Sequence, residues 1–351
     1  AQSDHRGPGR RSLLGRFHRY LMKIRTLDYH TAGEPLRIVT AGLPDIPGET
    51  MLERRRYMQC ELDHYRRILM LEPRGHADMY GAVLTMPEKT DGDVGVLFLH
   101  NAGYSTMCGH GIIAMVTAGL DYDLFPVRDR SAIRIDTPAG RVTARATIDS
   151  NGKVESVSFL NVPSFVWKSR VPVEAGGRRL NCTVAFGGAF YAYVHAEQLG
   201  LKLVPEEAAR LIELGREIKE NLGTSLELRH PEGEEDLNFL YGTIFVRSGR
   251  EPGRSRNVCI FADGELDRSP TGTGVSGRAA IHYSQGDVAL GQALEIESII
   301  GSTFRVSCVE ETRVGKLAAV IPEVTGSAFR TGRHEFVLDP CDPLHNGFLI
   351  R

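Results

Sequence analysis

Two stretches of the chain place a glycine-rich turn directly before a run of small and apolar residues. In the first half, Met107-Cys108-Gly109-His110-Gly111 precedes the apolar segment 112–116. In the second half, residues 271–274 precede a similar segment, 275–281. A segment that is apolar on nearly every side is typical of a buried helix. The pattern therefore predicts two buried helices, each starting at a glycine.

Short runs rich in β-branched residues lie on both sides of these helices and predict strands. In the first half they are 24–30, 36–40, 94–99, 132–135, 142–148 and 154–160. In the second half they are the glycine-broken region 184–195, then 241–246, 258–261, 294–299, 304–310 and 317–321. The pattern indicates strands wrapped around one buried helix in each half.

Two further segments have the periodicity of amphipathic helices. The first is 51–71, where Thr50 and Glu53 match a capping box. The second is 205–222, which has a proline in its first turn and a glycine after its end. Arginines are expected on the solvated side of the first helix: Arg54, Arg55, Arg56, Arg66 and Arg67.

The composition of the chain limits the range of functions that it could have. The 351 residues are 42% apolar and 25% charged, as in a globular protein of two or three domains. A net charge of −2 argues against nucleic acid or a membrane surface as a partner. No run approaches the length of a transmembrane helix. A small-molecule substrate is the expected partner.

Six cysteines scattered through a chain of this length favour free thiols in a cytoplasmic protein. The first 21 residues contain five arginines and one acid, Asp4. Such a composition fits a transit peptide. The favoured interpretation is an upstream extension, disordered or non-native, with Met22 as the natural start.

Cys108 is the main candidate for chemistry. The first N–H groups of a helix have no partner inside it and can bind a carboxylate. The same partial positive charge favours a thiolate. A thiolate beside a bound carboxylate is placed to remove the proton alpha to it. The competing interpretation is a small buried apolar residue.

The second glycine-rich turn belongs to the stretch Asp267-Arg268-Ser269-Pro270-Thr271-Gly272-Thr273-Gly274. Thr271 lies 163 positions after Cys108. That spacing suits a duplicated domain and is far too long for a solenoid repeat. Two similar halves, each directing a helix N-terminus at a shared cleft, would hold one carboxylate from both sides.

These two loops resemble the paired signature of the proline racemase family, whose members carry a cysteine in both. The segments 31–35, 72–81 and 342–348 are also similar, and the resemblance covers about residues 24–351. Thr271 replaces the second cysteine. In this respect the chain is similar to the trans-3-hydroxy-L-proline dehydratase branch of the family.

The resemblance implies an α/β (α+β) fold of two pseudo-symmetric domains, similar to that of diaminopimelate epimerase. Each domain is a curved sheet or barrel around a central helix, and the active site lies in the interdomain cleft. The implied N-terminal domain is 22–166 plus about 338–351, and the C-terminal domain is 167–337. A homodimer without cofactor or metal is expected.

The resemblance also implies residue roles. Cys108, His110 and Thr271 occupy the catalytic positions, and Asp267 accepts the ring nitrogen of the substrate. The remaining substrate-binding residues are Gly109, Gly272, Thr273, Tyr80 and Phe261. Core packing is an equally good interpretation of the two aromatic residues, and Cys259 is interpreted as a buried strand residue.

The presence of Thr271 in place of a second cysteine favours dehydration over racemisation. A racemase needs two acid–base groups of matched pKa, and an aliphatic hydroxyl is too weak for either role. In trans-3-hydroxy-L-proline the hydroxyl shares a face with the alpha hydrogen, so water can leave from one face. Cys108 would be the base, and either His110 or the protonated Cys108 the acid. The expected product is Δ1-pyrroline-2-carboxylate.

Two alternatives remain open. One is a proline racemase or 4-hydroxyproline 2-epimerase, and the other is a non-catalytic amino-acid-binding protein. Residues 272–277 also match G-x-G-x-x-G, but a turn and not a strand precedes them, so a dinucleotide site is rejected. Cys60 and His64 lack a second ligand pair for a metal.

Overall fold

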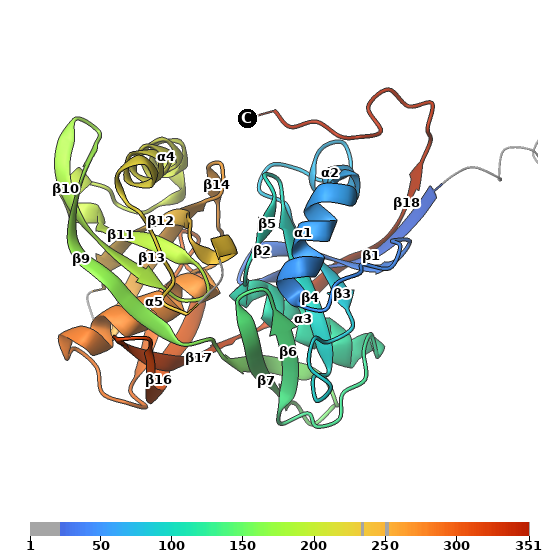
Figure 1. Ribbon diagram of the computed structural model, residues 1–351, viewed down its shortest axis with the longest axis horizontal. Coiled ribbons are helices and arrows are strands. Elements are labelled where there is room, and N and C mark those ends of the chain that lie inside the picture. Colours follow the sequence, from blue (N-terminus) through green and yellow to red (C-terminus); the bar gives the residue numbers. More distant parts are fainter. Residues whose placement is uncertain (1–21, 233–234, 250–252, 351) are drawn as a thin grey trace, which may run out of the picture.

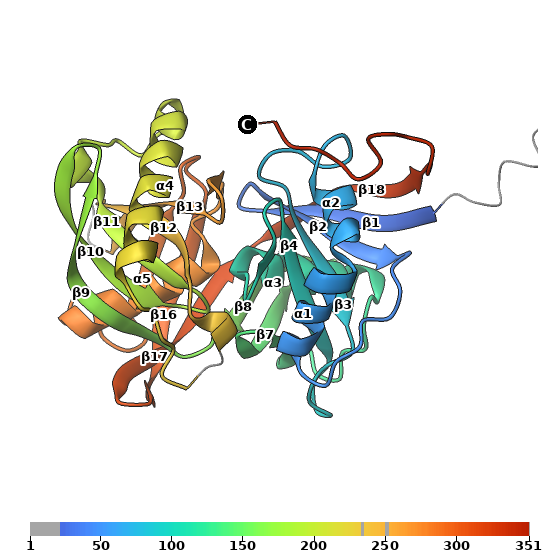
Figure 2. The ribbon, with the colours of Figure 1, turned by 45° about the horizontal axis from the view of Figure 1, so that its top comes forward.

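The computed structural model describes residues 22–232, 235–249 and 253–350. The predicted extension, 1–21, therefore lies outside the described residues. The described strands form one continuous mixed sheet, which curves around two helices in two neighbouring halves (Figures 1 and 2).

The first half contains α1 and α2, which pack on the outside, and the central helix α3. Its elements are β1 (Met22–Thr31), β2 (Glu34–Ala41), α1 (Met51–Glu61), α2 (Asp63–Met70), β3 (Tyr80–Thr85), β4 (Val94–His100), β5 (Tyr104–Ser105), α3 (Gly109–Tyr122), β6 (Ile133–Thr137), β7 (Gly140–Ile148) and β8 (Val154–Leu160).

The second half has α4 outside and α5 at its centre. Its elements are β9 (Ser164–Ala175), β10 (Arg178–Phe186), β11 (Phe190–His195), the 3₁₀ helices η3 (Ala196–Leu199) and η4 (Pro205–Glu207), α4 (Ala208–Ser225), η5 (Glu235–Leu237), β12 (Leu240–Ser248), β13 (Arg254–Phe261), β14 (Glu265–Leu266), α5 (Gly272–Gln285), β15 (Ala293–Glu297), β16 (Thr303–Val314), β17 (Leu317–Gly326) and β18 (Ala328–Leu338).

The two halves repeat one order of strand pairings. In the first, β2 runs parallel to β3, β3 antiparallel to β4, and β4 parallel to β6. In the second, β11 runs parallel to β12, β12 antiparallel to β13, and β13 parallel to β15. The short strands β5 and β14 pair with β4 and β13 in the same way. The duplication predicted from the two loops is confirmed by this topology.

Each central helix is buried because the sheet surrounds it. α3 is buried from Gly109 to Gly119 and α5 from Gly272 to Ile281. α3 contacts strands β1, β2, β7, β8 and β18, and α5 contacts β9, β10, β16 and β17. The predicted α/β fold, a curved sheet around a central helix in each half, is confirmed.

Strand β17 connects the halves, because it pairs with β9 at Ala319–Val320 and with β8 at Glu323–Gly326. β18 then returns to the first half and pairs with β1 along its whole length. We propose that the domain division follows these pairings, with the return beginning at Ala328. The predicted boundaries at 166 and 338 stay predictions.

The prediction of one continuous helix over 51–71 was wrong. The helix expected over 51–71 is two helices, α1 and α2, which meet at Leu62. The capping box of Thr50 and Glu53 is present. Two of the arginines expected in solvent are buried: Arg54 donates to the Gly48 carbonyl at 2.9 Å, and Arg66 pairs with Asp63 at 2.6 Å.

Candidate active site

The two central helices begin against each other at the junction of the halves. A Cβ atom on Gly272 would lie 2.5 Å from the Cα of Gly109, and a Cβ on Gly109 equally close to Gly272. Only residues without a side chain allow this approach. The contact brings two helix N-termini, each with unpaired N–H groups, to one small volume.

We expect Gly272→Ala to inactivate the protein and to lower its melting temperature. The added methyl group would separate the helix starts, and overpacking typically costs about 1–3 kcal/mol. Gly223→Ala is the matched control, because this glycine lies in α4 with open space around its Cα. Thermal unfolding and turnover should be measured for both. Wild-type values for the Gly272 variant would show that the close approach is dispensable.

Cys108 is the N-cap residue of α3. Its sulfur accepts a hydrogen bond from the N–H of Gly111 at 3.2 Å and lies 3.2 Å from Nδ1 of His110. Nε2 of the same ring lies 3.7 Å from the sulfur. The imidazole is therefore placed to exchange a proton with the thiol.

Burial decides the resting protonation of this pair. It raises the pKa of the Cys108 thiol well above its ordinary value, although the N–H of Gly111 acts in the opposite direction. Burial also lowers the pKa of His110, so this ring is neutral. The sequence predicted a thiolate favoured by the helix start. In the structure, the desolvation of the sulfur outweighs that effect, and the resting pair is a thiol beside a neutral imidazole.

Asp267 and Thr271 form the corresponding group on the second loop. The hydroxyl of Thr271 donates to Oδ2 of Asp267 at 2.7 Å, and the N–H of Ser269 donates to Oδ1 at 2.7 Å. Thr271 has a φ of 69°, which is uncommon for a β-branched residue. The hydroxyl hydrogen is therefore committed to the carboxylate, in a loop held in an unusual backbone conformation.

One cavity brings together all nine residues predicted for the site. It has about 20 Å³ of space for the centre of a water-sized molecule, which is room for one or two waters. A substituted ring needs more room than this cavity offers. The lining residues are Tyr80, Met107, Cys108, Gly109, His110, Tyr191, Tyr241, Phe261, Asp267, Thr271, Gly272 and Thr273.

The sequence reasoning missed three of the lining residues: Met107, Tyr191 and Tyr241. A signal for Tyr241 was present, because Tyr241-Gly242 repeats Tyr80-Gly81 at the corresponding strand of the other half. Tyr191 had no comparable signal. Its hydroxyl bonds with the hydroxyl of Thr273 at 2.7 Å, a contact that only the fold creates.

The reasoning also missed Glu34, which lies at the start of β2 and is fully buried. One carboxyl oxygen accepts the N–H of Arg268 at 2.7 Å, which links the β1–β2 turn to the loop that carries Asp267. The other oxygen, Oε1, has no hydrogen-bond partner within the described ranges. Burial, and then the charge of Asp267, raises the pKa of Glu34, so we expect a neutral carboxylic acid that braces this loop.

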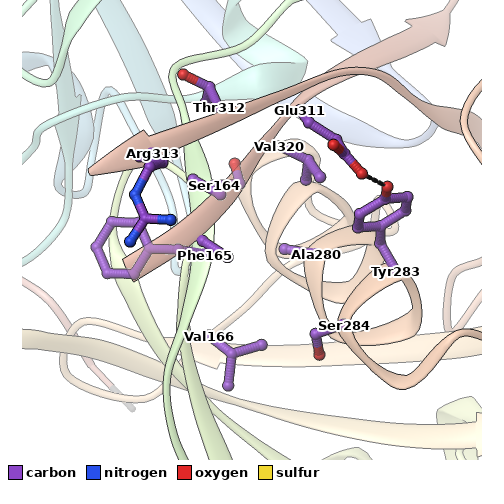
Figure 3. A pocket seen from close by; sticks show the side chains of 12 residues that line it. Ser164, Phe165, Val166, Ala280, Tyr283, Ser284, Glu311, Thr312, Arg313 and Val320 are labelled. Carbon is purple, nitrogen blue, oxygen red and sulfur yellow. Dashed lines mark hydrogen bonds between the residues drawn. The ribbon is translucent and has the colours of Figure 1, made fainter. Parts of the chain in front are cut away.

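A larger cavity of about 710 Å³ lies away from these residues, between α5 and strands β9, β16 and β17 (Figure 3). Its lining includes Phe165, Ala280 and Val320, and the one carboxylate drawn there, Glu311, accepts the hydroxyl of Tyr283. It lacks the cysteine, histidine and aspartate that line the smaller cavity. The smaller cavity at the helix starts is the better candidate active site.

Within the described ranges, no group of three or more His, Cys, Asp or Glu side chains is placed to hold a metal ion. None of the helices in that part of the chain is long and apolar enough to cross a membrane.

Comparison with known proteins agrees with the fold. The chain is 47% identical over 327 residues to trans-3-hydroxy-L-proline dehydratase of Bacillus cereus, with 93% of this chain and 97% of that protein covered. It is 39% identical over 335 residues to proline racemase of Clostridioides difficile, which covers 95% of this chain and 100% of the relative.

Among solved structures, the chain is similar to a hydroxyproline epimerase from Agrobacterium vitis with bound trans-4-hydroxy-L-proline. The TM-score is 0.87 at 30% identity, and the match covers 94% of this chain and 95% of that one. Residues 26–349 also match the family described as proline racemase. On these grounds the chain belongs to the proline racemase family.

Proposed function

We propose that this protein is a hydro-lyase that removes water from trans-3-hydroxy-L-proline and gives Δ1-pyrroline-2-carboxylate. The observation that carries the proposal is the unequal pair of loops, with Cys108 and His110 in one and Thr271 bound to Asp267 in the other. Relatives named for this activity support it. Proton transfer alone performs the reaction, so no cofactor is needed.

The substrate carboxylate would bind between the helix starts. Gly109 and His110 begin α3, Gly272 and Thr273 begin α5, and all four residues line the cavity. Their backbone N–H groups are the proposed donors to the carboxylate. These dipoles stabilise the ground-state carboxylate. They stabilise still more the enolate charge that develops when the alpha proton leaves.

Proton transfer would begin with the thiol. His110 takes the proton of Cys108, and the resulting thiolate removes the alpha proton of the substrate. The imidazolium then gives its proton to the departing 3-hydroxyl, the C3–O bond breaks, and water leaves. The thiol and the neutral imidazole are thereby restored. The enamine that remains tautomerises to the cyclic imine.

Thr271 would take no part in proton transfer. Its hydroxyl donates to Asp267, and a carboxylate is far too weak a base to deprotonate an alcohol. The second face of the substrate therefore faces no effective acid or base. This difference argues against the racemase and epimerase alternatives, which need a matched group on each face.

The direct test of the proposed function is incubation with trans-3-hydroxy-L-proline followed by an assay for the cyclic imine. Formation of the imine, with release of one water per substrate, is the expected result. Its absence, together with the appearance of an epimer of proline or 4-hydroxyproline, would favour the racemase alternative. Binding with no turnover of any of these ligands would favour a binding protein.

We expect Asp267→Asn to weaken substrate binding about tenfold or more. The carboxylate is the proposed partner of the ring ammonium, and a hydrogen bond to a charged group contributes about 1.5–3 kcal/mol. Affinity should be measured by calorimetry in a Cys108→Ser background. Asp287→Asn is the control, because this aspartate lies at the surface beside His282. An unchanged affinity would show that Asp267 only braces its loop.

A further inference from the structure

Three buried hydroxyl groups beside the cavity have no part in the reaction described above. The hydroxyl of Tyr80 is hydrogen-bonded to that of Ser105 and lies 3.3 Å from the hydroxyl of Tyr241. Their residues are only 3%, 1% and 5% exposed. Tyr80 and Cys108 line the same cavity. We call these three residues the hydroxyl cluster.

The cluster is assembled from both halves of the duplicated fold. Tyr80 begins β3, and Tyr241 occupies the equivalent position of β12, so the two hydroxyls meet where the halves join. They come together only when the halves are closed on each other.

The hydroxyl of Ser105 has no counterpart in the second half of the fold. In the first half Ser105 pairs with Phe98 across β4 and β5, and in the second half the equivalent pair is Ile260 with Leu266. A hydroxyl is therefore present on the side of Cys108, and an apolar side chain takes its place on the side of Thr271. The polar residue thus lies in the same half as Cys108, and the apolar residue lies in the same half as Thr271.

The cluster has a hydrogen to donate. Three hydroxyls carry three hydrogens, and the two bonds inside the cluster use two of them. The third is available to the sulfur of Cys108 or to an oxygen of a ligand. Burial raises the pKa of both tyrosines well above the usual value, so both remain protonated donors.

We propose that Tyr80, Ser105 and Tyr241 form the binding site for the 3-hydroxyl group of the substrate. This proposal rests on the proposed function and names the group that determines its specificity. In trans-3-hydroxy-L-proline that hydroxyl lies on the same face as the alpha hydrogen, so it faces Cys108. The cluster holds it there.

The neighbouring histidine fits this arrangement. The ring of Tyr80 packs edge-on against the ring of His110, with centroids 4.8 Å apart. A hydroxyl bound at the cluster is therefore close to the imidazole that delivers its proton. L-Proline would leave the buried hydroxyls without this partner, and sites built to bind a hydroxyl discriminate strongly against analogues that lack it.

Packing against the substrate ring is the competing role for the two tyrosines. Tyr80 and Tyr241 both contact Phe261, with ring centroids 5.9 and 5.5 Å apart, so they do form an aromatic wall. A phenylalanine would serve that role as well as a tyrosine. The hydroxyl of each residue can therefore be tested separately from its ring.

The experiment measures binding, so it does not depend on turnover. Dissociation constants of trans-3-hydroxy-L-proline, trans-4-hydroxy-L-proline and L-proline are determined by calorimetry for Cys108→Ser protein. They are then determined for the same protein carrying Tyr80→Phe, Tyr241→Phe or Ser105→Ala. Tyr193→Phe is the matched control, because it removes a buried hydroxyl that donates to the Gly274 carbonyl, outside the cluster.

We expect each cluster substitution to reduce the preference for the 3-hydroxylated ligand over L-proline by about tenfold, and the control to leave it unchanged. Preferences that stay at the parental value in all folded variants would overturn the proposal. A loss confined to the 4-hydroxylated ligand would overturn the assignment to C3. If the wild-type protein forms no imine while the preference falls as expected, the proposed function fails and the hydroxyl site stands.

Discussion

Cys108→Ser should abolish the dehydration of trans-3-hydroxy-L-proline while the protein stays folded and still binds the substrate. The serine hydroxyl fits the same N-cap position and can accept the N–H of Gly111, so the start of α3 is retained. The pKa of an alcohol lies far above that of a thiol, so the imidazole generates far less alkoxide from serine than thiolate from cysteine. Imine formation should fall by at least about 1,000-fold, in line with the loss of an acid–base group.

Cys60→Ser is the control for the general effect of replacing a thiol, because Cys60 is exposed on α1. Its turnover should match that of the wild type. Substrate binding by the Cys108 variant, measured by calorimetry, separates loss of chemistry from loss of fold. Turnover near the wild-type rate in that variant would remove Cys108 from the role of base.

L-Proline kept with the protein in heavy water should be recovered as the L isomer, deuterated at the alpha position or unlabelled. It has the carboxylate, the ring nitrogen and the alpha hydrogen, but it has no hydroxyl to expel. If only Cys108 exchanges protons, deuterium returns to the face from which hydrogen was removed. Chiral chromatography with mass spectrometry measures both properties.

In the same assay Thr271→Cys should produce some D-proline. The substitution supplies a second acid–base group on the opposite face, and cysteine, which is not β-branched, fits a φ of 69° at least as well as threonine. Thr271→Ser, which keeps a hydroxyl, is the matched control and should give none. D-Proline formed by the unmutated protein, at a rate near that of dehydration, would show that the second face is served by Thr271 or a neighbour.

Much of the fold could be predicted because its signals are local. The apolar run after Cys108 and the capping box of Thr50 and Glu53 act through neighbours in sequence, and both are present. β3, β9 and β18 were not predicted, nor were the two-residue strands β5 and β14. Only the two end residues of β18 are buried, so no alternating pattern marks it as a strand. Its partner β1 is some 300 residues away along the chain.

The site residues that lie in the two glycine-rich loops could be predicted from the sequence. Cys108 and Thr271 lie next to glycines in two repeated motifs, Asp267 lies four residues before Thr271, and all three line one cavity. Tyr241 was missed although Tyr241-Gly242 repeats Tyr80-Gly81, and Glu34 was missed because its role is a contact with Arg268 across the halves. The protonation of Cys108 was also beyond reach, since it depends on burial that the sequence does not report.

The contact of Gly109 with Gly272 has an electrostatic consequence. Each helix N-terminus carries roughly half a positive charge, so closure of the empty protein sets two like charges against each other. At short range this repulsion is of the order of 1 kcal/mol. A carboxylate between the helices converts repulsion into attraction on both sides. We therefore expect a bound carboxylate to stabilise the contact between the two halves relative to the empty protein.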